Sequence, residues 1–281
     1  MDSLFYLRTL VLRPMVKQIK NHMAAKSKLE SLKQQKHLEP TNEKKLTNGQ
    51  LTFIYTTRLE NCPYLDNRLE RKIVIKLSDE TCNHSYDHLV KAGFRRSGFG
   101  AYQQSCPNCS ACIPTRICVK DFYPSKSMRR ITRINIDLTT TLLPNCATNE
   151  HFELFKQYQE QRHSDGEMAD MNFLDYCALV EESPLSTSIV EFRTDDQTLV
   201  GVCLFDTLSD SISAVYTFFH PSQKRRSLGI YMIIWLINHC STSKKEYLYL
   251  GFWINQISKM DYKKRFKPIQ ILENNQWRNT D

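Results

Sequence analysis

Long apolar runs and glycine are both scarce in this sequence of 281 residues. The longest uninterrupted apolar stretch runs from Ile230 to Ile237, far short of the roughly 18–20 residues that a membrane-spanning helix needs. Glycine occurs eight times, about half the usual frequency of roughly 7%. With 41% apolar and 24% charged residues, the composition excludes a fibrous protein, a fully disordered chain and a bundle of membrane spans.

A clean signal peptide is missing from the start of the sequence. Ten cysteines would suit a secreted, disulfide-rich chain, but Arg8, Arg13 and Pro14 interrupt the opening and leave no apolar core of a signal peptide. We therefore expect a cytoplasmic, reducing environment with mostly free thiols. The basic, acid-poor opening also resembles an organelle transit peptide, and the sequence leaves that alternative open.

The net charge of +8 is concentrated at the beginning of the chain. Residues 1–50 contain ten Lys or Arg and four Asp or Glu, whereas residues 51–281 contain 28 bases and 26 acids. A nucleic-acid surface on the body must therefore be a local cluster of bases and not a property of the whole. Because residues 1–50 show no buried apolar face, we expect them to form a basic, poorly ordered extension.

The apolar pattern after residue 50 predicts an α+β protein. Residues 51–57 and 71–77 alternate or run apolar as strands do, and a helix over 85–92 is expected to end at Gly93. The later elements follow the order of an acetyltransferase: a helix over 149–161, three antiparallel strands within 188–219, a helix over 228–239, a strand over 246–252, a helix over 256–266 and a strand over 268–272. We expect an N-terminal cysteine-containing domain over 51–145 and a C-terminal acetyltransferase-like (GNAT-like) α/β domain over 146–281.

Eight segments match one family in content and in order. They are CPYL at 62–65, GFRRSG at 93–98, CPNCSACIPTR at 106–116, PSKSMRR at 124–130, YQEQRHSDGEM at 158–168, SAVYTFFHP at 213–221, RSLGIY at 226–231 and YLGFWINQISKMDYKKRFKP at 249–268. With these segments the chain resembles the aminoacyl-tRNA–protein transferases, and in particular the bacterial aspartate/glutamate leucyltransferases. One short motif would be a weak signal, whereas eight in register are a specific one.

The resemblance implies an enzyme that moves leucine from leucyl-tRNA to the N-terminal Asp or Glu of a protein. The product would carry a degradation signal for a downstream protease adaptor, with no membrane involved. The leucyl ester is already activated, and the attacking α-amine has a pKa of about 7.7–8.0. Positioning of the two reactants and hydrogen-bond donors for the oxyanion then supply most of the acceleration, so that neither a catalytic triad nor a cofactor is required.

Arg95 and Arg96 are the candidate acceptor-binding residues. They lie in a turn flanked by Gly93, Gly98 and Gly100, which permits close approach of a peptide backbone. One planar guanidinium would bind the acidic side chain of the acceptor through two hydrogen bonds. The sequence does not tell the two arginines apart, and two solvated arginines before a strand are the alternative.

A basic segment after Pro124 is a candidate for tRNA binding. Lys126, Arg129, Arg130 and Arg133 have the i, i+3, i+4, i+7 spacing of one helix face. This local excess of bases suits phosphate groups. A solvated helix face is the alternative.

Arg226, Ser227 and Gly229 form a second candidate for tRNA binding. They lie in the turn where acetyltransferases present backbone N–H groups to a pyrophosphate. The two-glycine pattern for pyrophosphate is absent here, so we expect the turn to meet the 3′ end of the tRNA. A plain helix N-cap by Ser227 is compatible with both interpretations.

The candidate catalytic residues follow the helix over 149–161, with one more on a later strand: Arg162, His163, Asp165, Glu167 and Tyr216. The first four form a mixed acid–base turn with room for a proton acceptor. Tyr216 would donate a hydrogen bond to the oxyanion. Each of them is also compatible with an ordinary exposed polar group or a hydrogen bond in the core.

Cys62, Cys106, Cys109 and Cys112 are the candidate metal ligands. The C-x2-C-x2-C spacing of the last three suits zinc or an iron–sulfur cluster, and the arginyl-transferring relatives have a cysteine-rich N-terminal region linked to a cluster. The first cysteine pair of those relatives is broken here, because Leu65 stands where the second thiol would be. Reduced cysteines that pack or line a site are the alternative.

Two other functions remain open at this point. An arginyltransferase would act on the same acidic N-termini, but its donor pocket should contain an unpaired acid, whereas a leucine pocket should be apolar. A non-catalytic tRNA- or peptide-binding module, or a CoA-dependent acetyltransferase, is the more remote alternative. The missing two-glycine pattern argues against CoA, and the intact motifs from 158 to 268 argue against lost catalysis.

Overall fold

The computed structural model of the protein describes residues 39–40, 44–45, 51–52, 54–77, 82–164, 166–255 and 257–280. Residues 40–281 form one compact unit. The expected extension over 1–50 lies almost entirely outside the described residues and stays a prediction. Within the described ranges, no helix combines the length and the apolar character that crossing a membrane requires.

Up to residue 104, the described residues form short strands and one helix. Their bounds are β1 (Glu39–Pro40), β2 (Lys44–Lys45), β3 (Leu51–Thr52), β4 (Ile54–Thr56), β5 (Glu60–Asn61), β6 (Leu69–Glu70), β7 (Lys72–Lys76), α2 (Cys82–Lys91), β8 (Arg95–Ser97) and β9 (Gly100–Gln104). Strands β4, β7, β9 and β8 are neighbours in this order. Tyr86 and Val90 of α2 are buried together with Ala101. Helix α2 ends where the sequence predicted, and Gly93 follows it with a φ of 90°.

The second sheet has eight strands in the order β11-β12-β13-β14-β15-β10-β16-β17. Their bounds are β10 (Ile113–Cys118), β11 (Thr139–Pro144), β12 (Ser186–Arg193), β13 (Leu199–Thr207), β14 (Ser211–Phe219), β15 (Tyr247–Trp253), β16 (Ile269–Glu273) and β17 (Gln276–Asn279). Strand β10 comes from the range expected to be the N-terminal domain, yet it lies between β15 and β16. The domain boundary after residue 145 stays a prediction, but the large sheet takes strands from both sides of it.

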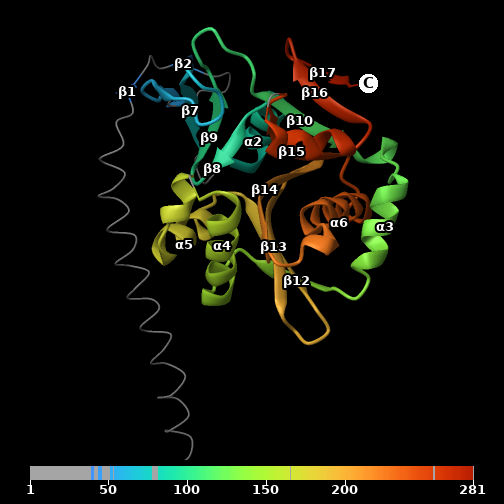
Figure 1. Ribbon diagram of the computed structural model, residues 1–281. Helices are drawn as coiled ribbons and strands as arrows, with labels where there is room; N and C mark the ends of the chain where they lie inside the picture. Colours follow the sequence, from blue (N-terminus) through green and yellow to red (C-terminus); the bar gives the residue numbers. More distant parts are fainter. Residues whose placement is uncertain are drawn as a thin grey trace, which may run out of the picture. The chain divides into compact units, whose positions relative to one another are not determined.

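Helices cover both faces of the large sheet (Figure 1). They are α3 (Lys126–Ile134), α4 (Asn149–Arg162), α5 (Phe173–Glu181) and α6 (Leu228–Thr242), with 3₁₀ turns η1 (Val119–Asp121), η2 (Glu167–Asp170), η3 (Lys224–Arg226) and η4 (Ser258–Arg265). Successive side chains of a strand point to opposite faces. In β12, Ile189 accordingly packs in the core beneath α4 and α5, whereas Val190 and Phe192 pack in the core beneath α6.

The acetyltransferase-like part has the predicted arrangement. Strands β12, β13 and β14 are consecutive and antiparallel, and α6 returns the chain so that β15 runs parallel to β14. The mixed α/β fold with an acetyltransferase-like C-terminal part is therefore confirmed. The helix expected over 256–266 is instead the 3₁₀ segment η4.

Helix α5 and strand β17 are among the elements that were not expected from the sequence. Strand β17 pairs with β16 across a two-residue turn, Asn274–Asn275, in which both φ angles are positive (49° and 60°). Trp277 holds β17 in place, because its ring lies 5.6 Å from the Tyr249 ring and 4.4 Å from the guanidinium carbon of Arg116. The asparagine pair was the signal in the sequence, since Asn tolerates this backbone conformation.

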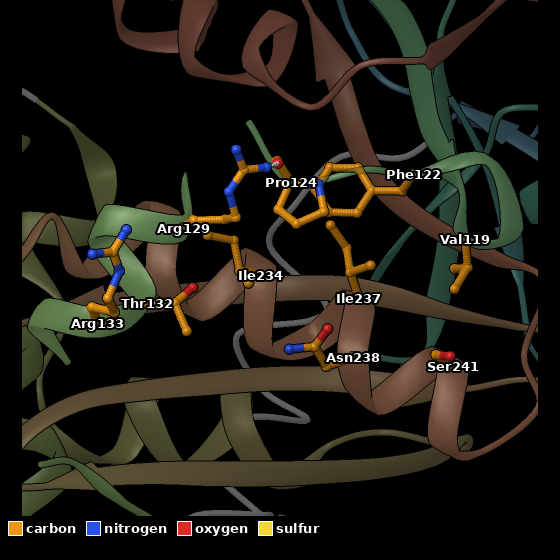
Figure 2. Close-up of a pocket in the computed structure, with 10 residues that line it drawn as sticks. All are labelled: Val119, Phe122, Pro124, Arg129, Thr132, Arg133, Ile234, Ile237, Asn238 and Ser241. Carbon is orange, nitrogen blue, oxygen red and sulfur yellow. Dashed lines mark hydrogen bonds between the residues drawn. The ribbon is translucent and has the colours of Figure 1, made fainter. Parts of the chain in front are cut away.

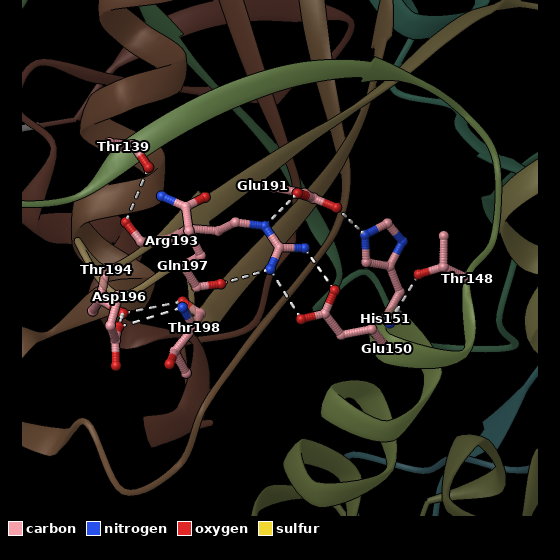
Figure 3. Close-up of polar contacts among 10 residues, drawn as sticks. All are labelled: Thr139, Thr148, Glu150, His151, Glu191, Arg193, Thr194, Asp196, Gln197 and Thr198. Atoms are coloured by element: carbon pink, nitrogen blue, oxygen red, sulfur yellow. Dashed lines mark hydrogen bonds and ion pairs between the residues drawn. The ribbon is translucent and has the colours of Figure 1, made fainter.

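A charged network fixes the start of α4 on β12 (Figure 3). Both terminal nitrogens of Arg193 donate to Glu150, at 2.9 and 2.6 Å, and its Nε donates to Glu191 at 2.7 Å. A further hydrogen bond of 2.6 Å joins Glu191 to Nε2 of the buried His151. Burial raises the pKa of Glu191, but the hydrogen bonds from Arg193 and His151 outweigh it and hold the pKa below its usual value. The network positions the rest of α4 over β14.

Candidate active site

The two parallel strands of the large sheet are paired over only part of their length. Strands β14 and β15 pair only through Ser211, Ile212 and Ser213. Beyond this point residues 214–217 of β14 are only half-buried, although Phe218 after them is buried again. On the other strand Gly251 is buried, and the next two residues are half-buried. We call the space between 214–217 and 251–253 the β14–β15 opening.

The guanidinium of Arg95 reaches the β14–β15 opening from strand β8. Its Nη2 donates a hydrogen bond of 3.3 Å to the carbonyl oxygen of Val215. Gly251 on the opposite strand has a φ of 76°, and a Cβ there would overlap the guanidinium and lie 2.5 Å from its Cζ. Only glycine therefore admits Arg95 at this place. Nη1 of Arg95 is shielded from solvent and has no hydrogen-bond partner among the described residues.

Arg96 points to the other side of β8 and already forms a buried ion pair. Its Nε donates to Oδ2 of Asp206 at 2.7 Å, and the two side chains are 1% and 0% exposed. The second oxygen of Asp206 accepts a hydrogen bond of 2.7 Å from Thr187. The structure thus separates two arginines that the sequence left equivalent, because only Arg95 lies at the β14–β15 opening.

Lys263 places a second buried cation beside Arg95. The lysine is 6% exposed, and its Nζ donates to the carbonyl oxygen of Phe252 in β15. Burial, reinforced by the positive charge of Arg95, lowers the pKa of Lys263 from 10.5 to about 7. Within the described part of the chain, neither Arg95 nor Lys263 forms an ion pair with a carboxylate. The opening therefore presents positive charge without a counterion of its own.

Tyr216 lies on β14 at the β14–β15 opening. Nε2 of Gln159, from α4, donates a hydrogen bond of 2.7 Å to its hydroxyl oxygen. Burial raises the pKa of Tyr216 to about 12, with the hydrogen bond from Gln159 opposing and the nearby hydroxyl of Tyr158 adding to the effect. The phenol is therefore neutral at physiological pH. Because its oxygen accepts from Gln159, its O–H group is left to donate.

His163 follows α4 directly, at the edge of the same region. Its ring lies 5.6 Å from the ring of Tyr158. Burial, together with the positive charges of Lys259 and Arg162, lowers the pKa of His163, so that the imidazole is neutral and able to accept a proton. Lys259 donates to the carbonyl oxygen of Arg162 at 3.3 Å and so ties η4 to the end of α4.

The other predicted catalytic residues are less completely defined. The guanidinium carbon of Arg162 lies 5.5 Å from the ring of Phe219. Asp165 lies outside the described residues, as does the side chain of Glu167. His163 thus follows α4 and Tyr216 contacts it through Gln159, and the catalytic roles of all five residues stay predictions.

The basic segment after Pro124 forms a helix, α3, as its spacing predicted. Met128 and Ile131 face the core. The four predicted tRNA-binding bases of this helix are exposed: Lys126, Arg129, Arg130 and Arg133. Nη1 of Arg129 donates to the carbonyl oxygen of Pro124 at 2.6 Å, which leaves the rest of its guanidinium available.

The turn at Arg226 is held by contacts within the protein. Its guanidinium donates to both carboxylate oxygens of Asp137, at 2.8 and 2.7 Å, and these hydrogen bonds lower the pKa of Asp137. Ser227 stands at the N-cap of α6 with a φ of 51°, but its side chain makes no capping hydrogen bond. A Cβ at Gly229 would lie 3.1 Å from Phe219, so any larger residue there would make the Phe219 ring shift by a few tenths of an ångström. Arg226 is thus less available to a phosphate than the bases of α3.

The four candidate metal-binding cysteines are half-buried thiols. Burial raises the pKa of Cys112 to about 12, and the neighbouring Cys106, Cys62 and Cys109 add to the effect, so the four lie near one another. In the described ranges, however, no group of three or more His, Cys, Asp or Glu side chains is arranged to hold a metal ion. The metal site at these cysteines stays a prediction, and we derive no step through it.

Lys263, Gln159 and Gly251 were missed by reasoning from the sequence. Lys263 belongs to the run KMDYKKR, which looks like a solvated basic stretch. Its burial depends on the 3₁₀ conformation of η4, in which Lys263 is the buried residue. Gly251 carried a detectable signal, because an isolated glycine inside a strand pattern indicates a bulge or a close approach.

Comparison with known proteins agrees with the motifs. The family model described as arginine-tRNA-protein transferase, N terminus, matches residues 60–130, and the model of the C terminus matches residues 150–273. The aspartate/glutamate leucyltransferase of Paramagnetospirillum magneticum is 46% identical over 226 residues, covering 80% of this chain and 93% of that protein. The enzyme of the same name from Rhodospirillum rubrum is 45% identical, covering 80% and 92%.

A solved structure, L-PGS from Bacillus licheniformis, is 11% identical and has a TM-score of 0.44, covering 73% of this chain and 63% of that one. The two family models and the curated relatives confirm the resemblance seen in the sequence. The chain belongs to the aspartate/glutamate leucyltransferases, within the family of the arginine-tRNA-protein transferases.

Proposed function

We propose that the protein transfers leucine from leucyl-tRNA to the N-terminal Asp or Glu of acceptor proteins. The modified N-terminus would then act as a degradation signal for a protease adaptor. The single observation that carries the acidic specificity is the guanidinium of Arg95 at the β14–β15 opening, with Lys263 beside it, for which the described residues supply no carboxylate. A bound Asp or Glu side chain would provide the missing negative charge. Since leucyl-tRNA is a substrate of translation, we place the reaction in the cytoplasm.

The same charges favour leucine over arginine as the transferred residue. An arginyl side chain would need an acid at the site, and it would be repelled by the positive charge of Arg95 in a medium of low dielectric constant. A leucyl side chain can pack on the apolar and aromatic surface beside the opening, which includes Tyr158, Phe219 and Tyr262. The arginyl alternative is therefore disfavoured by electrostatics.

The reaction needs little from the protein beyond alignment and charge stabilisation. The acceptor α-amine attacks the leucyl ester carbonyl, an N–C bond forms, and the C–O bond to the ribose breaks. In this proposal Tyr216 donates its O–H to the developing oxyanion. His163 accepts the proton that the amine loses, and the proton then goes to the departing ribose oxygen. No resident cofactor takes part in these steps.

The substrate specificity follows from this arrangement. With labelled leucyl-tRNA, we expect the protein to transfer leucine to peptides that begin with Asp or Glu and not to those that begin with Ala or Lys. A parallel reaction with labelled arginyl-tRNA should give little or no transfer. Equal labelling of an Ala-starting peptide would show that the acidic specificity is wrong, and binding without any transfer would favour a non-catalytic module.

Arg130 offers a direct measure of phosphate contact by α3. Its side chain is exposed, so Arg130→Ala should leave the fold intact. The variant should bind tRNA more weakly, because its binding releases fewer counterions from the tRNA phosphates. The slope of log K against log salt concentration should fall by about 0.7–0.9 for one lost phosphate contact. Arg278→Ala, which removes an exposed base on β17, is the charge-matched control. An unchanged slope for Arg130→Ala would remove α3 from the phosphate contacts.

A further inference from the structure

A cavity of about 430 Å³ lies between helices α3 and α6, apart from the β14–β15 opening (Figure 2). Its apolar walls consist of Val119, Phe122, Pro124, Ile234 and Ile237. Ile234 and Ile237 are only 4% and 3% exposed, so they are fixed in the core. Phe122 is half-buried, and its ring lies 6.2 Å from the ring of Phe266. The cavity thus has an apolar lining and a size that small ligands occupy.

Polar side chains border the same cavity, and the charged ones among them are all positive. Arg129 and Arg133, one helical turn apart on α3, lie on one side, and Asn238 and Ser241 of α6 lie on the other. The side chain of Asn238 is exposed and offers both a hydrogen-bond donor and an acceptor. Neither α3 nor α6 contains an Asp or Glu. The cavity is therefore complementary to a ligand with a flat apolar body, hydrogen-bonding edges and negative charge.

We propose that this cavity binds one unpaired nucleotide of the tRNA, with the base inside and its phosphate at Arg129 and Arg133. The proposal rests on the proposed function, which supplies tRNA as the substrate. Single-stranded bases are recognised by stacking on flat side chains and by hydrogen bonds to their edges. Phe122 and the two isoleucines supply the surfaces, Asn238 the hydrogen bonds, and the arginines the phosphate contact. The cavity between α3 and α6 shares no residue with the β14–β15 opening. A nucleotide bound in this cavity therefore anchors the tRNA away from the reacting ester.

Filling the cavity tests the proposal on the full-length protein. Asn238→Trp places a large ring at the cavity from an exposed position of α6, and Thr242→Trp places the same ring on an exposed, non-lining position of the same helix. Binding of uncharged tRNA and of a short oligoadenylate is measured for both. Loss of a stacked base corresponds to about 5- to 150-fold weaker binding. We expect this loss for Asn238→Trp and none for Thr242→Trp.

The salt dependence separates the base from the phosphate. Arg133→Ala should reduce the salt slope of tRNA binding, whereas Asn238→Trp should weaken binding with the slope unchanged, because Asn238 is uncharged. If Asn238→Trp binds tRNA and oligoadenylate as the unmodified protein does, the proposal is overturned, while leucine transfer by the unmodified protein would leave the proposed function standing. If the unmodified protein transfers no leucine but Asn238→Trp still loses tRNA, the proposed function fails and the nucleotide site remains.

Discussion

Replacing Arg95 by alanine is expected to raise the KM for an Asp-starting peptide roughly 10- to 150-fold, with the affinity for leucyl-tRNA nearly unchanged. A hydrogen bond to a charged group contributes about 1.5–3 kcal/mol, and each 1.4 kcal/mol corresponds to about a tenfold change. Arg95 is the arginine at the β14–β15 opening, and its Nη1 has no partner among the described residues. Peptide titrations at saturating leucyl-tRNA, and tRNA titrations without peptide, measure the two quantities separately.

Arg96→Ala is the matched control for Arg95→Ala. It removes one partner of a buried ion pair and leaves Asp206 uncompensated, so we expect a loss of about 3–5 kcal/mol of unfolding free energy and a general loss of active protein. Arg95→Lys keeps the charge but loses the planar fork, and it should restore peptide binding only in part. If folded Arg95 variants lose affinity for tRNA while their dependence on peptide stays normal, our assignment of this residue to the acceptor is wrong.

The contrast between Arg95 and Arg96 shows which properties of the site could be predicted from the sequence. The alternation of a strand already predicts that neighbours such as Arg95 and Arg96 face opposite sides. Which side is the core depends on Asp206, which is 110 positions further along the chain. The same holds for Arg226, whose partner Asp137 is 89 positions away. Local patterns do not reveal such long-range pairs, so the roles of these arginines could not be separated from the sequence alone.

The elements themselves were more predictable than the site. Strands β12 to β14 and helices α3, α4 and α6 follow from periodicity, because their apolar spacing repeats over several turns or pleats. The insertion of β10 between β15 and β16 follows from no local signal, because its partners are distant in the chain. The β14–β15 opening depends on this assembly, and so does the placement of Lys263 beside it.

Lys263 should make the stability of the protein depend on pH in a defined window. Its pKa is about 7 in the folded protein, against an ordinary value of 10.5. Between these two pH values the unfolded chain binds the extra proton, so the free energy of unfolding rises with pH in this window. Below about pH 7 the lysine is protonated in both states, and the cost of burying its charge is fully present. Above about pH 10.5 the lysine is neutral in both states and this cost is gone.

Lys263→Met is therefore expected to stabilise the protein most at low pH. The difference in unfolding free energy between Lys263→Met and the unmodified protein should shrink by up to roughly 5 kcal/mol between pH 7 and 10.5, measured by denaturant titration across the pH range. Lys264→Met, which replaces the exposed neighbouring lysine, is the control and should not reproduce this change.

An acidic peptide should oppose the effect of burial on Lys263, because a bound carboxylate stabilises the charged form of Lys263 and raises its pKa. Peptide binding near pH 8 should then take up protons in the unmodified protein and lose this uptake in Lys263→Met. A pH-independent difference between the two proteins, with no proton uptake in either, would contradict the buried, uncompensated charge that we assign to the opening.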